Sequence, residues 1–255
     1  MIQLENVSKA YPRQRKQRSA ALAVDDISFT GQPGRVFSLL GPNGAGKTTT
    51  LRMIATILQP TAGSIRVAGY DTVSQATQVR SQIGFLTGST HLYDRLTPAE
   101  TVRYFGRLHG LDRATIATRQ DQLFEQLGIH EFASKRVGQL STGMKQKVSI
   151  ARTMIHDPSV VIFDEPTSGL DVITAHSIIE LIRECRQAGK TVIFSSHIMS
   201  EVDLLCDDLA IINRGKLIYQ NTMDHFRGQT DASLTEGFIR MIQTDNNPQP
   251  ELQTV

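Results

Sequence analysis

Short apolar runs bounded by polar turns recur along the chain, and each predicts a buried β-strand. The first spans residues 35–40, and later ones lie at residues 160–163, 191–195, 209–213 and 216–219. A helical pattern over residues 174–188 separates two of these runs. Because strands and helices alternate, we expect an α/β protein with a parallel sheet.

A long helical pattern, residues 96–156, interrupts this alternation. Thr97 and Glu100 have the spacing of a capping box, and Pro98 stands at the first helical position. Further along, four apolar residues recur at spacings of four, three and four: Met144, Val148, Ala151 and Ile155. This spacing marks one buried helix face, so we expect a helical segment inserted between strands.

Composition adds little to this picture. The chain has 255 residues, 40% of them hydrophobic and 20% charged, which suits one large globular domain or two small ones. A net charge of +2 gives no electrostatic case for binding nucleic acid. The basic run at residues 13–18 is interpreted as a solvated loop, because no aromatic residues are interleaved with its charges.

Three further features bear on where the chain works. The N-terminus lacks the apolar stretch of a secretory signal, and the apolar runs are too short to cross a bilayer. Cys185 and Cys206 lie outside any metal-binding or redox motif. We therefore expect reduced core thiols in an intracellular protein, which is still free to dock on a membrane.

Residues 41–48 fit the phosphate-binding pattern G-x-x-x-x-G-K-[ST] at every position. The loop follows a predicted strand and leads into an apolar helix at residues 49–58, whereas a chance glycine-rich turn would lack this context. Backbone N–H groups of such a loop point at an anion, and the helix N-terminus adds partial positive charge. Lys47 is placed to neutralise the outer phosphates, and the Thr48 hydroxyl to hold Mg²⁺.

Two acids, Asp164 and Glu165, follow the apolar run at residues 160–163. Ligands of α/β sheets bind at the carboxyl ends of strands. Asp164 is expected to reach Mg²⁺ through a water. Glu165, pointed elsewhere by strand alternation, is expected to act as base on an attacking water. His197 follows the next strand, where a γ-phosphate contact is favoured. Alone, these residues would be a solvated strand end and a structural histidine, but the phosphate loop favours catalysis.

The order of these segments resembles that of the ATP-binding cassette (ABC) ATPases. The resemblance rests on the phosphate loop, STGMKQK at residues 141–147, VVIFDEPTSGLD at 160–171 and SSH at 195–197, and it covers roughly residues 2–226. Few families place a serine-glycine signature just before the acidic strand. It implies a P-loop NTPase (RecA-like) core with an inserted helical subdomain.

The resemblance also implies roles for single residues, with ATP and Mg²⁺ as cofactors. Glu165, His197 and Lys47 match catalytic positions, and Thr48 and Asp164 match metal-binding positions. The matches to nucleotide-binding positions are Tyr11, Gly41, Pro42, Asn43, Gly44, Ala45, Gly46, Lys47, Thr48, Thr49, Ser141 and Gly143. Tyr11 is matched to the aromatic that stacks on adenine, and its alternative is a plain core tyrosine.

Residues 140–144 correspond to the signature L-S-G-G-Q, in which Ser141 and Gly143 match but Thr142 and Met144 do not. A hydroxyl and a close-approach glycine remain at a helix N-terminus, which suits phosphate. In the family this helix meets ATP bound by the other protomer of a head-to-tail dimer. Residues 168–171 match the D-loop, which crosses to that partner.

Gly88 occupies the position of a family glutamine that contacts Mg²⁺ and the attacking water, and Thr87 or Ser89 is a candidate replacement. We expect the loop after it to join the sheet core to the helical subdomain. The strings FLTG, LYDRLT and IHDP resemble the ATPases of sodium-extruding exporters of the NatA type and related drug exporters. The segment 233–238 resembles a pattern near the end of such subunits.

These expectations describe one ABC ATPase domain over residues 1–230, with a RecA-like core at 1–88 and 158–226 and a helical subdomain at 89–157. Residues 231–255 are expected to form a helix and a frayed polar tail. The expected function is to hydrolyse ATP for efflux, with sodium as a candidate cargo. The expected partners are a second copy and a separate multi-helix membrane subunit, at the cytoplasmic face of the cell membrane, and no nucleic acid. The alternatives are an ATPase of a drug or other small-molecule exporter, a soluble ABC ATPase acting on DNA or ribosomes, and a non-hydrolysing nucleotide-binding regulator.

Overall fold

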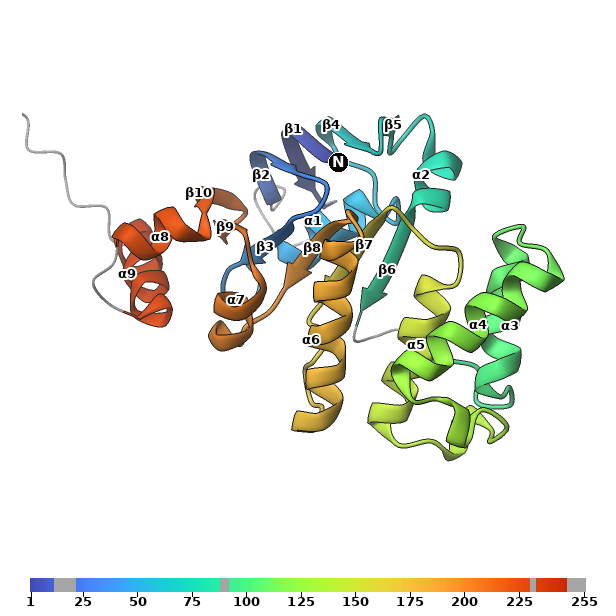
Figure 1. Cartoon of the computed structure of the whole chain (residues 1–255). Helices are drawn as coiled ribbons and strands as arrows, with labels where there is room; N and C mark the ends of the chain where they lie inside the picture. Colours follow the sequence, from blue (N-terminus) through green and yellow to red (C-terminus); the bar gives the residue numbers. More distant parts are fainter. Residues whose placement is uncertain (12–21, 88–91, 230–232, 247–255) are drawn as a thin grey trace, which may run out of the picture.

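The computed structural model describes residues 1–11, 22–87, 92–229 and 233–246 of the chain (Figure 1). Its strands are β1 Ile2–Ala10, β2 Leu22–Gly31, β3 Val36–Leu40, β4 Ala62–Val67, β5 Tyr70–Asp71, β6 Ile83–Thr87, β7 Val160–Asp164, β8 Thr191–Ser195, β9 Asp208–Asn213 and β10 Lys216–Thr222. Its helices are α1 Lys47–Ile54, α2 Ala76–Gln82, α3 Pro98–Leu108, α4 Arg113–Leu127, α5 Thr142–Met154, α6 Val172–Gln187, α7 Met199–Leu205, α8 Met223–Gln229 and α9 Leu234–Asn246, with 3-10 turns at His130–Phe132 and Val137–Gln139.

The larger sheet has the strand order β10-β9-β3-β8-β7-β6. Its neighbours pair in parallel except β10, which runs antiparallel to β9 at one edge. Strands β3, β7 and β8 are buried along their whole length, since elements cover both faces. On β3, Phe37 and Leu39 face one core while Val36 and Leu40 face the other. The predicted parallel α/β sheet is confirmed.

A second, antiparallel sheet with the order β2-β1-β4-β5 lies across α1 from the parallel sheet (Figure 1). One apolar core joins the two sheets, with Leu51 and Ile54 of α1 packed between Ile2 on one side and Ile162 on the other. The opposite face of the parallel sheet packs against α5, α6 and α7 through a separate core. The strand that carries the phosphate loop is therefore fixed from both sides.

Most predicted element bounds agree with the structure within two residues, but α1 does not. It was expected at residues 49–58, and it runs from Lys47 to Ile54. Thr56 has a φ of 62°, and the N–H groups of Ile57 and Leu58 both donate to the carbonyl of Arg52. This left-handed turn ends the helix, although the apolar pattern continues beyond it.

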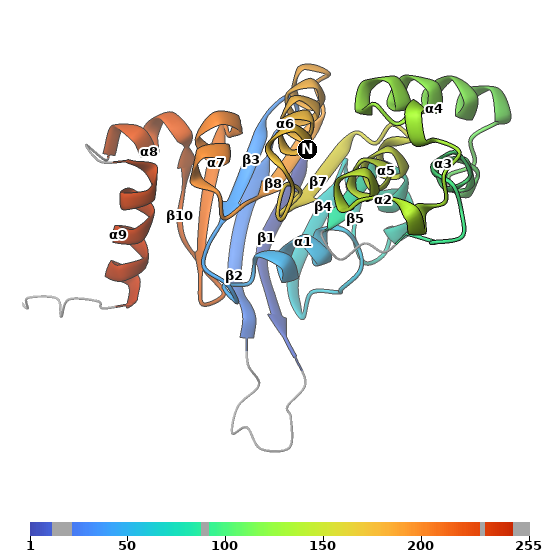
Figure 2. The same ribbon diagram turned by 90° about the horizontal axis from the view of Figure 1, so that it is seen from below.

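Helices α3, α4 and α5 lie together at one end of the molecule, and α8 and α9 lie at the other (Figures 1 and 2). The predicted capping box at the start of α3 is present, with Thr97 and Glu100 bonding reciprocally. The predicted apolar face of α5 is buried at Val148, Ala151 and Ile155. Within the described segments, no helix is both long and apolar enough to span a membrane.

The C-terminal helix α9 begins after Ser233, which forms a second capping box with Glu236. It packs back on the sheet edge, where the Asn213 side chain donates to Asp245 and Asn246. The polar tail was expected from residue 244, but residues 244–246 belong to α9. The rest of that tail, residues 247–255, and the basic run at residues 13–18 lie outside the described residues. So do Gly88, Ser89 and the expected boundaries at 88/89 and 230/231.

Candidate active site

The phosphate loop connects the carboxyl end of β3 to the first turn of α1. Gly46, which caps α1, has a φ of 113°, and a Cβ added to it would lie 2.5 Å from the carbonyl oxygen of Ala23. A Cβ on Gly41 would lie 2.2 Å from the carbonyl oxygen of Ile212. The loop is thus pressed against β2 and β9, and only glycine fits at either position.

The Lys47 ammonium folds back over this loop and donates to the carbonyl oxygens of Gly41, at 2.6 Å, and Pro42, at 3.2 Å. Its side chain is buried. Burial lowers the pKa of Lys47, and the negative charges of Glu165 and Asp164 oppose that shift. The structure therefore brings the predicted lysine and both predicted acids within electrostatic reach of one another.

Asp164 ends β7 with its side chain 7% exposed. The Ser195 hydroxyl donates to its carboxylate at 2.7 Å. The register places Thr87 of β6 and Ser195 of β8 on either side of Asp164, so three polar residues lie in one row at the carboxyl ends of these strands. Thr87, a candidate to replace the expected glutamine, is a direct neighbour of the acid.

The orientation of Glu165 has a different cause from the one predicted. The strand ends at Asp164, so strand alternation does not orient Glu165. Its backbone has a φ of 51°, and its N–H donates to both the carbonyl oxygen, at 3.0 Å, and the hydroxyl, at 3.2 Å, of Ser195. This left-handed turn sets the carboxylate beside His197, whose Nδ1 lies 3.5 Å from Oε2.

Thr48 and Thr49 are half-buried in the first turn of α1. Tyr11 is 40% exposed, which excludes the core interpretation, and the Lys9 ammonium lies 5.8 Å from its ring centroid. Tyr11 directly follows Ala10, which pairs with Leu22 of β2. The next residue of β2, Ala23, has its carbonyl against Gly46 of the phosphate loop. An exposed aromatic ring thus emerges from the sheet close to the phosphate loop.

Ser141 and Gly143 stand at the start of α5. The Ser141 hydroxyl caps the helix by accepting from the N–H of Met144 at 3.3 Å. A Cβ on Gly143 would come within 3.0 Å of the Thr174 hydroxyl, so the helix start is packed against the first turn of α6. Ser141 and Gly143 therefore lie where α5 meets α6, and no contact in the described part of the chain joins them to the phosphate loop.

Three residues at this site were missed by the sequence reasoning. Ser195 was predicted as the end of a strand and as part of the SSH string, without a role of its own, yet it contacts both acids. The Gln146 side chain of α5 donates to the carbonyl of Pro166 at 2.8 Å, which ties the signature helix to the turn after Glu165. Glu201 of α7 is a buried acid beside the same loops. Their spacing in sequence carries no signal, because each contact is made in three dimensions only.

The residues present fit a nucleotide with Mg²⁺. A glycine cradle, a lysine over it and a buried carboxylate at the adjoining sheet edge are the donors that phosphates and a hard cation require. Among the described residues, no group of three or more His, Cys, Asp or Glu side chains could hold a metal by itself. Mg²⁺ usually takes only one or two carboxylates together with substrate phosphates and waters, which agrees with a lone Asp164.

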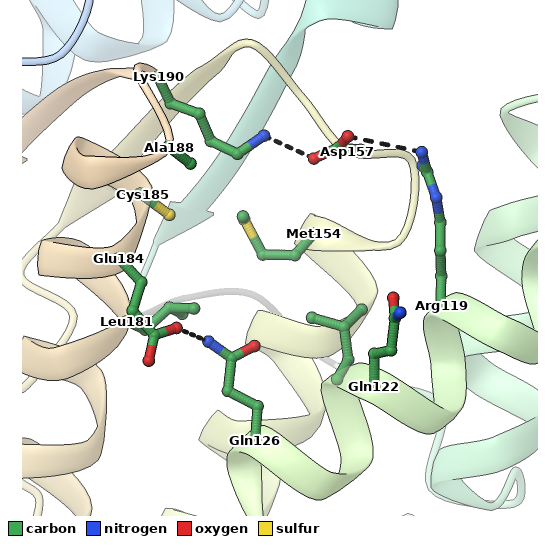
Figure 3. Close-up of a pocket in the computed structure, with 11 residues that line it drawn as sticks. Arg119, Gln122, Gln126, Met154, Asp157, Leu181, Glu184, Cys185, Ala188 and Lys190 are labelled. Carbon is green, nitrogen blue, oxygen red and sulfur yellow. Dashed lines mark hydrogen bonds and ion pairs between the residues drawn. The ribbon is translucent and has the colours of Figure 1, made fainter.

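A separate cavity of about 350 Å³ lies between α4, α5 and α6 (Figure 3). Asp157 accepts from Lys190 at 2.6 Å and lies 3.5 Å from Arg119, while Gln126 donates to Glu184 across the opening. Asp157 and Lys190 precede β7 and β8, so this cavity is at the amino ends of the strands. It is therefore distinct from the phosphate site at their carboxyl ends.

Comparisons with known proteins agree with this geometry. The family model described as ABC transporter matches residues 24–168, more than half of the chain, and a shorter match to an AAA domain spans residues 135–203. The ABC transporter ATP-binding protein NatA of Bacillus subtilis is 46% identical and covers 88% of this chain and 90% of its own length. The linearmycin resistance ATP-binding protein LnrL of Bacillus subtilis is 36% identical, with 86% and 68% covered. The Nod factor export ATP-binding protein I of Ralstonia nicotianae is 39% identical, with 81% and 64% covered.

Solved structures extend the likeness to three dimensions. An ATP-binding subunit of an ABC transporter superposes with a TM-score of 0.85 at 28% identity, covering 94% of this chain and 98% of that one. A dimeric post-hydrolysis state of the ATP-binding cassette MJ0796, bound to ADP and Pi, has a TM-score of 0.79 at 25% identity, with 88% and 99% covered. The predicted fold class is confirmed: this chain belongs to the ABC transporter family as an ATP-binding and ATP-hydrolysing subunit.

Proposed function

We propose that this chain powers an exporter by closing on ATP with a second copy of itself and moving a separate multi-helix membrane subunit. The observation that carries the proposal is the grouping of Lys47, Asp164, Glu165 and His197 around one phosphate loop. The dimer is supported by two exposed apolar residues at the start of α6, Val172 and Ile173, which are 85% and 79% exposed. The proposed location of the chain is the cytoplasmic face of the cell membrane, where it binds as a peripheral subunit.

The proposed domain division keeps residues 1–88 and 158–226 as the RecA-like core and residues 89–157 as the helical subdomain, within one domain over 1–230. Residues 231–255 form a C-terminal extension. The grouping of α3, α4 and α5 at one end of the molecule supports the division (Figure 2). The ion pair between Lys190 and Asp157, and the hydrogen bond from Gln126 to Glu184 across the same cavity, would then join the two parts.

In the proposed mechanism, Gly41 to Thr49 hold the phosphates and Tyr11 stacks on the adenine. Lys47 leaves the loop carbonyls to neutralise the outer phosphates. Thr48 and, through a water, Asp164 would hold Mg²⁺, and the ion would supply positive charge to the phosphates.

Glu165 takes a proton from the attacking water, and His197, 3.5 Å from that carboxylate, contacts the γ-phosphate. Ser141 and Gly143 bind the nucleotide held by the other subunit. In the order of the reaction, binding closes the dimer and hydrolysis reopens it.

A pair of substitutions tests the catalytic assignment. Glu165→Gln removes the base but keeps the size of the side chain, so we expect turnover to be lost and an ATP-bound dimer to accumulate in size-exclusion chromatography. Lys47→Ala should lose ATP binding itself. Glu180→Gln changes a half-buried acid of α6 that pairs with Arg183, far from the proposed reaction, and it serves as the control. Near-normal turnover by Glu165→Gln would show that the base has been assigned wrongly.

For the cargo, we propose sodium ions, on the likeness to NatA over 88% of the chain. The likeness to linearmycin-resistance and Nod-factor export proteins supports a small-molecule exporter as the second candidate. Affinity purification from gently solubilised membranes, followed by mass spectrometry, should recover a multi-helix membrane protein. The two together in vesicles should then move sodium on ATP addition, and movement of an organic compound instead would favour the second candidate. Recovery of ribosomes or DNA in place of a membrane protein would overturn the exporter proposal.

A further inference from the structure

Glu201 is a buried acid in the short helix α7, 7% exposed. One of its oxygens, Oε2, accepts two hydrogen bonds of 2.9 Å, from the hydroxyls of Thr167 and Ser196. No lysine, arginine or histidine of the described residues lies within ion-pair distance of it, whereas the exposed acids Asp157 and Asp203 have such partners. Hydroxyl groups thus supply both hydrogen bonds to this oxygen.

The two hydroxyl donors come from the two loops that carry the proposed reaction. Thr167 lies two residues after Glu165, and its carbonyl accepts from Leu170 in the segment expected to face the partner subunit. Ser196 lies directly before His197, and its hydroxyl also accepts from the N–H of Ile198 at 3.0 Å. A single carboxylate oxygen therefore joins the loop after β7 to the loop after β8.

Stability alone does not account for an acid at this place. A carboxylate taken out of water loses hydration, and hydrogen bonds from neutral hydroxyls have to offset that loss. What the acid provides is geometry, because two donors that share one acceptor atom are held at a fixed separation. The same two loops carry Glu165 and His197, whose side chains lie 3.5 Å apart.

We propose that Glu201 is a positioning residue, which fixes the turn carrying Glu165 against the turn carrying His197. The proposal rests on the catalytic roles proposed above for these two residues. Glu201 touches neither the nucleotide nor the water, and it acts only through Thr167 and Ser196. Movement of the segment after Thr167 is thereby passed to the histidine loop.

The test compares Glu201→Ala and Glu201→Gln with the unchanged chain in steady-state ATP hydrolysis. We expect Glu201→Ala to lower kcat by about tenfold or more, since small misplacements of reacting groups cost this much. KM for ATP should stay within about twofold, because the phosphate loop is a separate segment. Glu201→Gln keeps an oxygen that accepts from both hydroxyls, so it should restore most of kcat. Asp203→Ala, which removes an exposed ion pair from the same helix, is the matched control.

The design keeps structural failure apart from loss of positioning. If Glu201→Ala does not fold, Thr167→Val and Ser196→Ala each remove one donor at little change of size and should each lower kcat severalfold. Unchanged kcat in Glu201→Ala, or in both single-donor variants, overturns the proposal, as does a rise in KM with unchanged kcat. Loss of turnover in Glu165→Gln alongside normal Glu201→Ala would leave the proposed function standing and reject only the positioning role.

Discussion

Three glycines with positive φ allow the close packing of the phosphate loop to be tested. Gly110, Gly44 and Gly46 have φ values of 77°, 79° and 113°. A Cβ would meet nothing within 4 Å at Gly110 or Gly44, but would lie 2.5 Å from the Ala23 carbonyl at Gly46. Substituting each by alanine therefore separates backbone strain from the close approach of the loop to β2.

The magnitudes follow from these contacts. Alanine in the left-handed region costs about 1–2 kcal/mol, which we expect for Gly110→Ala and Gly44→Ala. At Gly46 the loop must also move away from β2. That movement disturbs two 2.8 Å hydrogen bonds, from Asp25 N–H to the Gly215 carbonyl and from Gly215 N–H to the Ala45 carbonyl. At about 0.5–1.5 kcal/mol each, the total for Gly46→Ala is about 2–5 kcal/mol.

Two assays read the series. Thermal unfolding should place Gly110→Ala and Gly44→Ala together and Gly46→Ala clearly lower, at about 2–4 °C for each kcal/mol. In ATP titration, Gly110→Ala should bind normally, while Gly46→Ala should bind at least about tenfold more weakly, because a displaced loop loses a charged hydrogen bond. If Gly46→Ala melted and bound ATP like Gly110→Ala, the argument that β2 fixes the loop would be refuted.

Three further outcomes are expected. Ser195→Ala removes the 2.7 Å bond to Asp164 and should lower the free energy of unfolding by about 1.5–3 kcal/mol in urea titrations. Burial lowers the pKa of His156 from 6.5 to about 4, and the positive charge of nearby His109 adds a smaller contribution in the same direction. Between pH 6.5 and 4 the folded chain therefore binds fewer protons than the unfolded chain. Stability should therefore fall between pH 6.5 and 4, by about 1–3 kcal/mol, and His156→Gln should flatten this dependence. Burial also raises the pKa of both Cys185 and Cys206 to about 12, so both thiols should react with a thiol reagent only after unfolding.

The parts of the fold that the sequence predicted are those in which a local pattern coincides with a local structure. The runs at residues 160–163 and 191–195 are apolar throughout because both of their faces are covered, and such runs predict buried strands. The phosphate loop was found for a similar reason, since a glycine cradle needs fixed spacing within a few residues. The strands of the antiparallel sheet carry no such run, and register shifts interrupt the alternation along β1.

The contacts that complete the site were not predicted from the sequence, because they join residues that are distant in the chain. Ser195 reaches an acid 31 residues away, Thr167 reaches Glu201 across 34, and Gln146 reaches Pro166 across 20. A serine at a strand end or an acid in a short helix is common, and its type alone does not indicate a partner. The left-handed turn at Glu165 was missed as well, because glutamate has no preference for that conformation.

That turn has a consequence for anyone who would improve the protein. A glutamate with a φ of 51° carries backbone strain of about 1–3 kcal/mol, which glycine or asparagine would relieve. A laboratory selection for heat resistance alone should therefore drift toward these residues at position 165 and yield sturdier chains that no longer turn over ATP. Thermal stability and ATP turnover place opposite demands on residue 165. Any library of variants selected for stability therefore has to be screened for ATPase activity as well as for melting temperature.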